Sequence, residues 1–218
     1  MIRINSLIKH YDNGLVKALN GVTFNLSIGE VCSIMGPSGC GKTTLLNLIG
    51  ALDIPTAGNI FIDGTNLSKI ASKAMYRNRT LGFIFQFHNL IPNITLVENV
   101  ELPTIAISGM NRVQRRDTAL KLLSEVGLDN RTNFLPTQVS GGERQLTAVA
   151  RALVNSPKIL LADEPTGNVD SDTAALIMSI ILQRSKKDNM TTLIVSHNKD
   201  IARQTERTLF MRDGCLVD

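Results

Sequence analysis

The sequence predicts an α/β protein that combines a mostly parallel sheet, an antiparallel β lobe and a helical insertion. First, short apolar runs rich in branched residues alternate with helical patterns, which is typical of parallel strands joined by crossover helices. Second, residues 1–30 and 59–63 indicate antiparallel strands bounded by turn signals such as Asp12-Asn13-Gly14. Third, helical patterns replace strand patterns between residues 97 and 155. The strand and helix pairs are residues 31–35 and 42–52, 158–162 and 172–184, and 191–196 and 198–204.

These patterns predict one domain over residues 1–218, because the sequence shows no internal repeat, low-complexity tract or long linker. We expect its core to contain residues 1–96 and 156–218, and its helical subdomain to span residues 97–155. A hydrophobic content of 43% is enough to bury a core and argues against a disordered chain.

The sequence also indicates where the protein resides. Its apolar runs fall well short of the roughly 18 residues that a membrane-spanning helix needs. The first five residues lack the basic start and apolar middle of a secretory signal. Cys32, Cys40 and Cys215 are an odd number and lack metal-ligand spacing. We therefore expect a cytoplasmic protein with reduced thiols.

A net charge of +4 raises the question of an anionic partner. The charges are scattered and aromatic residues make up only 4% of the chain, so we expect no nucleic acid partner. The densest basic group is Arg112, Arg115 and Arg116. It is either the solvated face of a helix or a phosphate-binding patch, and the helical pattern favours the first interpretation.

Residues 36–43 match the phosphate-loop pattern Gly-x-x-x-x-Gly-Lys-[Ser/Thr] between a predicted strand and a predicted helix. Glycines let backbone N–H groups surround phosphate oxygens, and the helix N-terminus adds partial positive charge. We expect Lys42 to meet the β- and γ-phosphates of a bound nucleotide, Thr43 to ligate Mg²⁺ and Thr44 to support the α-phosphate. The predicted ATP-binding residues of this loop are Gly36, Pro37, Ser38, Gly39, Cys40, Gly41, Lys42, Thr43 and Thr44. The match predicts a phosphate-loop NTPase core.

A second apolar strand, residues 158–162, ends in two carboxylates. Ligands of parallel sheets sit at such strand ends. We expect Asp163 to hold Mg²⁺ through water and Glu164 to polarise the attacking water as the catalytic base. His197 follows the strand at residues 191–196, where an imidazole would sense the γ-phosphate. A purely structural histidine is the alternative.

Residues 139–145, Val-Ser-Gly-Gly-Glu-Arg-Gln, resemble the Leu-Ser-Gly-Gly-Gln signature of ABC-transporter ATPases. Other phosphate-loop NTPases lack this signature, and the chain is similar to the family over essentially its whole length. The resemblance implies the ABC ATPase fold. It also implies that the signature contacts the ATP bound to the opposite subunit, through Ser140, Gly141, Gly142 and Glu143.

The same resemblance implies roles for four further residues. Tyr11 would stack on adenine, Gln86 would lie near Mg²⁺ and the attacking water, Asp170 would lie at the subunit interface, and His197 would be the switch histidine. Plainer alternatives stay open for three of them. Tyr11 is otherwise an ordinary loop tyrosine, Gln86 a polar strand end, and Asp170 a helix cap.

Within the family, residues 81–92, 98–103 and 161–168 look like the group that contains MacB, LolD and FtsE. Residues 86–88, 126–129 and 140–145 lean towards LolD, the ATPase of lipoprotein release. The chain departs from this group at four positions. It has Leu146 and Thr147 where Arg and Val are usual, and Val139 and Val169 where Leu is usual.

These resemblances imply the function. Two copies of the chain would sandwich two ATP molecules and drive a separate integral membrane transporter subunit from the cytoplasmic face of the inner or plasma membrane. Residues 86–92 would help to receive the partner's cytoplasmic helix. The implied role is mechanotransmission-type export or lipoprotein release, and the alternative is an FtsE-like regulatory ATPase that gates cell-wall hydrolases at division. A soluble ABC ATPase acting on ribosomes or DNA would predict two fused cassettes or a coiled-coil insert.

Overall fold

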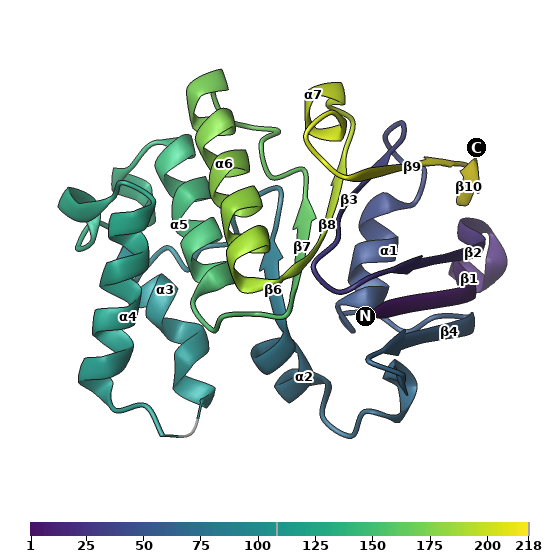
Figure 1. Cartoon of the computed structure of the whole chain (residues 1–218), viewed down its shortest axis with the longest axis horizontal. Coiled ribbons are helices and arrows are strands. Elements are labelled where there is room, and N and C mark those ends of the chain that lie inside the picture. The colour runs from purple at the N-terminus through teal and green to yellow at the C-terminus, as the bar shows by residue number, and fades with distance from the viewer. Residues whose placement is uncertain (108, 218) are drawn as a thin grey trace.

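The computed structural model describes residues 1–107 and 109–217, which form two sheets with helices between and around them (Figure 1). The larger sheet has the strand order β10-β9-β3-β8-β7-β6. Its strands are β3 (Val31–Met35), β6 (Leu81–Ile84), β7 (Ile159–Asp163), β8 (Thr191–Ser196), β9 (Arg207–Arg212) and β10 (Cys215–Val217). All neighbours pair in parallel except β9 and β10. The predicted mostly parallel sheet is therefore confirmed.

The smaller sheet is antiparallel and has the order β2-β1-β4-β5. Its strands are β1 (Ile2–Tyr11), β2 (Val16–Leu26), β4 (Ala57–Ile62) and β5 (Thr65–Asn66). Ile2 pairs with Leu26 on one side and with Ile62 on the other, so β1 is the central strand that joins the two predicted parts of the β lobe. The predicted antiparallel lobe is confirmed.

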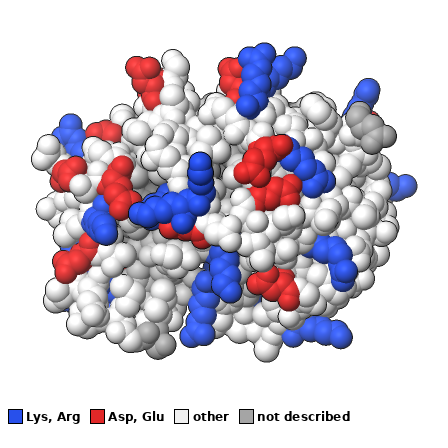
Figure 2. Space-filling model, viewed as in Figure 1, with Lys and Arg blue, Asp and Glu red and all other residues white. Residues whose placement is uncertain are grey.

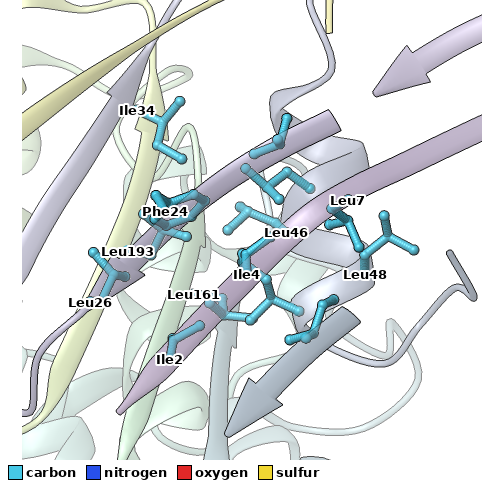
Figure 3. Close-up of a cluster of buried hydrophobic side chains, with 14 of the residues drawn as sticks. Ile2, Ile4, Leu7, Phe24, Leu26, Ile34, Leu46, Leu48, Leu161 and Leu193 are labelled. Atoms are coloured by element: carbon cyan, nitrogen blue, oxygen red, sulfur yellow. The ribbon is translucent and has the colours of Figure 1, made fainter. Parts of the chain in front are cut away.

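Helix α1 (Lys42–Ile49) lies between the two sheets, and its buried side chains join both to one core (Figure 3). Ile4 and Phe24 of the small sheet, Leu46 of α1, and Leu161 and Leu193 of the large sheet belong to the same buried cluster. Because α1 begins at the phosphate loop, this packing fixes the position of that loop relative to both sheets.

A helical region lies beside the β6 end of the large sheet (Figure 1). It contains α3 (Leu96–Glu101), α4 (Arg112–Glu125) and α5 (Gly141–Leu153), together with short 3-10 segments. Its core includes Leu123 of α4 and Val149 of α5, and Ile177 of α6 (Ser171–Asp188) joins the same cluster. Helices α2 (Lys73–Thr80) and α7 (Lys199–Ala202) lie outside this region. Helices thus replace strands where the sequence predicted, and a separate subdomain over residues 97–155 stays a prediction.

Several predicted element ends are wrong by a few residues. The first helix ends at Ile49 rather than residue 52, because Gly50 caps it and Ala51 adopts a left-handed φ of 51°. Helix α6 runs to Asp188, four residues beyond the prediction, and Asn189 ends it with a φ of 52°. Helix α7 covers only Lys199–Ala202 of the predicted residues 198–204.

The Arg112, Arg115 and Arg116 group lies on α4. Arg115 and Arg116 are both 3.8 Å from carboxylate oxygens of Glu101, and these pairs favour the helix-face interpretation. On the face shown in Figure 2, Lys and Arg side chains alternate with Asp and Glu. Among the described residues, no helix is long and apolar enough to cross a membrane.

Candidate functional site

A cavity of about 430 Å³ lies at the carboxyl ends of β3, β7 and β8, and most of the predicted site residues line it. The predicted residues that line it are Tyr11, Ser38, Gly39, Gly41, Lys42, Thr43, Thr44, Gln86, Asp163, Glu164 and His197. Val16, Lys17 and Ala18 of β2 also line it, and sequence reasoning missed them. A larger cavity of about 560 Å³ between α1 and β4 is lined by none of the predicted residues. The smaller cavity is therefore the candidate functional site.

The phosphate loop connects β3 to α1, as predicted. Its last glycine, Gly41, has a φ of 106° and forms the N-terminal cap of α1. A Cβ at Gly36 would lie 2.2 Å from the carbonyl oxygen of Met211, so this position also needs glycine. The Lys42 ammonium donates to the carbonyl oxygens of Gly36 and Pro37 at 2.7 and 2.9 Å. The loop therefore encloses a buried positive charge beside the N–H groups of a helix N-terminus.

Asp163 is the last residue of β7 and is buried next to the phosphate loop. Burial raises the pKa of its carboxyl, and the neighbouring Glu164 adds to this shift, whereas Thr43 and Lys42 oppose it. The Thr43 hydroxyl, the Asp163 carboxylate and the Gln86 side chain offer the oxygen ligands that Mg²⁺ prefers. Asp163 and Glu164 also place two adjacent carboxylates at this cavity, which favours a bound divalent cation, so these residues fit the ion.

Glu164 follows β7 in a strained backbone conformation with a φ of 44°. Its two carboxylate oxygens have different partners. The Ser196 hydroxyl donates to Oε2 at 2.7 Å, and His197 Nδ1 lies 2.7 Å from Oε1. Glu164 is only 9% exposed, whereas the His197 side chain is 67% exposed. The carboxylate is thus oriented into the cavity by two residues at the end of β8.

Sequence reasoning missed Ser196. It ends an apolar strand and is fully buried, and its Oγ also accepts from the Asn198 N–H at 3.1 Å. The only signal in the sequence was a hydroxyl residue directly before His197, and serine at a strand end is too common to indicate a contact with Glu164.

Gln86 lies two residues beyond β6, and its carbonyl oxygen accepts from Asn168 at 3.3 Å. The segment that follows is attached to α5. Arg151 donates to the carbonyl oxygens of His88 and Asn89, both at 2.6 Å, and Gln145 bonds to His88. A movement of residues 86–92 would therefore be transmitted directly to α5.

The signature forms the start of α5. Ser140 caps the helix through a reciprocal pair of hydrogen bonds, in which the Ser140 N–H donates to Glu143 Oε2 at 2.7 Å and the Glu143 N–H donates to Ser140 Oγ at 3.2 Å. The bond from the Ser140 backbone lowers the pKa of the Glu143 carboxyl despite its partial burial, and Arg131 contributes further. Gly141 and Gly142 form the first turn. Among the described residues that line the phosphate-loop cavity, none comes from the signature.

The two departures in α5 have local explanations. Leu146 is buried in the helical core cluster. Thr147 is fully buried, and its hydroxyl donates to the carbonyl oxygen of Glu143 at 2.8 Å. Neither residue lines the cavity, so both departures concern packing within α5 rather than the phosphate-loop cavity.

Asp170 is exposed and caps α6. Its carboxylate accepts from the Thr173 N–H at 2.9 Å and from the Thr173 hydroxyl at 2.7 Å. Capping, the alternative interpretation, is therefore present in the structure. The subunit-interface role stays a prediction.

Comparison with protein families and solved structures agrees with this geometry. The ABC transporter family matches residues 19–167. The structure is similar to a dimeric structure of MJ0796, described as a bacterial ABC transporter cassette, with 41% identity and a TM-score of 0.94 over 100% of this chain and 97% of the other. It is also similar to a second dimeric structure of MJ0796, described as a post-hydrolysis state of the ATP-binding cassette bound to ADP and Pi. The identity is 40% and the TM-score is 0.94, over 100% of this chain and 97% of the other.

A third similar structure is cbiO1 from Clostridium perfringens, described as part of the ABC transporter complex cbiONQ. It has 24% identity and a TM-score of 0.87 over 100% of this chain and 86% of the other. At this identity the similarity supports the fold alone.

Proposed function

The chain belongs to the ABC transporter family, and on this premise we propose that it is the nucleotide-binding subunit that drives a separate integral membrane protein. It binds ATP and is an ATPase. The observation that best supports the proposal is the single cavity that brings the phosphate loop, the Asp163-Glu164 pair and His197 together. A chain of this kind converts ATP hydrolysis into motion and does not itself contact the transported substrate.

In the proposed reaction, the phosphate loop binds the triphosphate through its N–H groups and Lys42. Glu164 orients the attacking water and accepts its proton. Ser196 and His197 keep the Glu164 carboxylate in place, and His197, being exposed, also contacts the γ-phosphate. Gln86 lies at the same cavity and senses whether the γ-phosphate is present.

Thr43, Gln86 and Asp163 would hold Mg²⁺, with Asp163 acting through water. The ion supplies a positive charge that offsets the charge developing on the phosphate oxygens during transfer.

We propose that two copies form each complete site. The signature does not line the phosphate-loop cavity of its own chain, although it offers the anion-binding N–H groups of a glycine-rich helix N-terminus. The helical subdomain, residues 97–155, would present Ser140, Gly141, Gly142 and Glu143 to the ATP of the other copy. Asp170 would lie at the same interface. The dimeric state of MJ0796 supports this arrangement.

The membrane partner would dock near residues 86–92. Phe87 is 73% exposed and Ile91 is 41% exposed, although both are large apolar side chains. This segment leads from Gln86 at the cavity to the bonds with Arg151 on α5. A partner bound there would connect the nucleotide site to the membrane from the cytoplasmic face.

Within the family, the motifs at residues 81–92 and 140–145 favour a LolD-like role in lipoprotein release or another mechanotransmission-type export. An FtsE-like role in division is the second candidate, since the same motifs belong to that group. Neighbouring lipoprotein-sorting genes would favour release, and neighbouring division genes would favour gating.

The docking proposal predicts the effect of Phe87→Glu. A charge at this exposed position would interrupt an apolar contact with the membrane partner, so we expect the copurifying integral membrane protein to be lost from pull-downs. ATP affinity of the isolated chain should stay unchanged, since Phe87 does not line the nucleotide cavity. Ile28→Glu is the matched control, because Ile28 is similarly exposed at 62% in the turn before β3. Unimpaired capture by Phe87→Glu would place the docking surface elsewhere.

Ser196→Ala tests the support of the catalytic base. It removes a buried hydrogen bond to Glu164, so we expect kcat to fall about tenfold, with KM for ATP nearly unchanged. The free energy of unfolding should fall by about 1 kcal/mol. Steady-state kinetics and urea unfolding measure the two effects. A Ser196→Ala enzyme with normal kcat would show that Glu164 needs only His197.

A further inference from the structure

Tyr11 ends β1 beside the nucleotide cavity, and its side chain contacts both Asp53 and Lys9. Its hydroxyl donates to Oδ2 of Asp53 at 2.7 Å. The Lys9 ammonium donates to Oδ1 of the same carboxylate at 2.7 Å and lies 4.6 Å from the centre of the Tyr11 ring. One carboxylate thus holds both the tip of the ring and the cation that lies over it.

In these contacts the Asp53 carboxyl stays ionised and the Tyr11 phenol stays neutral. Burial opposes ionisation of Asp53, but the bonds from Lys9 and Tyr11 together hold the pKa of its carboxyl below the usual range. Burial, and next the bond to Asp53, raises the pKa of the Tyr11 phenol. Tyr11 therefore stays a neutral donor to an ionised acceptor, which is a strong type of hydrogen bond.

Asp53 is itself firmly placed. It lies in the loop directly after α1, where the N–H groups of Leu52 and Asp53 donate to the carbonyl oxygen of Asn47 on α1. The carboxylate also accepts from the Ile54 N–H at 2.6 Å. Since α1 begins at the phosphate loop, Asp53 ties the Tyr11 ring to the helix that holds the triphosphate.

The ion pair between Lys9 and Asp53 is not the only attachment of this loop to β1. The Thr56 N–H donates to the Ile8 carbonyl oxygen at 2.9 Å, and the His10 N–H donates to the Thr56 hydroxyl at 3.0 Å. These bonds join the two segments without the Asp53 carboxylate. The carboxylate instead contacts two side chains of β1, Lys9 and Tyr11, and Tyr11 lines the nucleotide cavity.

We propose that Asp53 and Lys9 are positioning residues that fix the Tyr11 ring at the height and angle at which it stacks on the nucleotide base. The inference rests on the proposed stacking role of Tyr11. With Lys9 over one face of the ring, the other face receives the base. Asp53 and Lys9 therefore control the affinity for the base and leave phosphate binding unchanged.

The test compares ATP with magnesium tripolyphosphate, which has the phosphates and no base. For Asp53→Ala and Lys9→Met we expect KM for ATP to rise about fivefold, because a ring that is free to rotate loses part of the stacking energy. We expect kcat at saturating ATP and the inhibition constant of tripolyphosphate to stay within about twofold of the wild type. Asp53→Asn should raise KM for ATP less than Asp53→Ala does, because its amide oxygen still accepts from Tyr11.

Asp188→Asn is the matched control, since it removes a carboxylate from another surface ion pair, with Arg184, and should change none of these constants. An equal loss of affinity for ATP and tripolyphosphate in Asp53→Ala would show that Asp53 supports the loop rather than the ring. An unchanged KM for ATP would also overturn the proposal.

Tyr11→Ala separates this inference from the proposed function. If Tyr11→Ala raises KM for ATP and Asp53→Ala does not, Tyr11 stacks without needing Asp53, and only the positioning role is wrong. If Tyr11→Ala leaves KM for ATP unchanged, the stacking role itself is wrong.

Discussion

Replacing Glu164 with Gln is expected to lower kcat for ATP hydrolysis about 100- to 10,000-fold, which is the contribution of a general base. The amide fills the same space and still accepts from Ser196 at the position of Oε2, so the cavity should keep its shape. It cannot take a proton from water. MgATP affinity should therefore stay within about twofold of the wild type, and single-turnover hydrolysis with an equilibrium binding assay measures both quantities.

Glu206→Gln is the control, because Glu206 is exposed and does not line the cavity. The comparison shows whether a loss of turnover is specific to the Glu164 carboxylate, which contacts Ser196 and His197. Near-normal turnover by Glu164→Gln would contradict the assignment of Glu164 as the base. A loss of ATP binding along with turnover would instead show that Glu164 shapes the nucleotide cavity.

Replacing Lys42 with Ala is expected to weaken MgATP binding about 100-fold. The Lys42 ammonium is enclosed by the phosphate loop, and charged hydrogen bonds contribute about 1.5–3 kcal/mol each, so the loss of two bonds to phosphate oxygens weakens binding by at least about this factor. The chain has two tyrosines and no tryptophan, so quenching of tyrosine fluorescence by a base that stacks on Tyr11 offers one binding assay, with calorimetry as a second.

Lys69→Ala removes an exposed lysine outside the cavity and should bind MgATP normally. Lys42→Ala also leaves the carbonyl oxygens of Gly36 and Pro37 without their donor, so its thermal unfolding is measured alongside. If Lys42→Ala remains folded and binds MgATP as tightly as the wild type, the loop is not the phosphate site.

Much of the fold could be predicted because its strongest signals are local. The apolar strand at Val31–Met35, the glycine loop after it and the helix at Lys42 are contiguous in sequence, and the structure shows each of them. The apolar run before Asp163 and Glu164 likewise fixed the position of β7 to within one residue. Binary patterns of this kind depend on neighbouring residues alone.

Other features depend on contacts between distant residues and had no local signal. The bond between Ser196 and Glu164 spans 32 positions, and that between Tyr11 and Asp53 spans 42. The strands β9 and β10 were not predicted, because their burial is incomplete and their pattern is weak. The end of the first helix was misplaced because a single left-handed residue, Ala51, decides it.

In the proposed arrangement, ATP joins two copies of the chain through two incomplete half-sites. The most direct test is the mass of Glu164→Gln by light scattering, with and without MgATP, since this variant should bind ATP without hydrolysing it. The proposed arrangement predicts a monomer without nucleotide and a dimer with MgATP, because binding of ATP then favours association by linkage. A stable dimer without nucleotide, or a monomer at saturating MgATP, would contradict it.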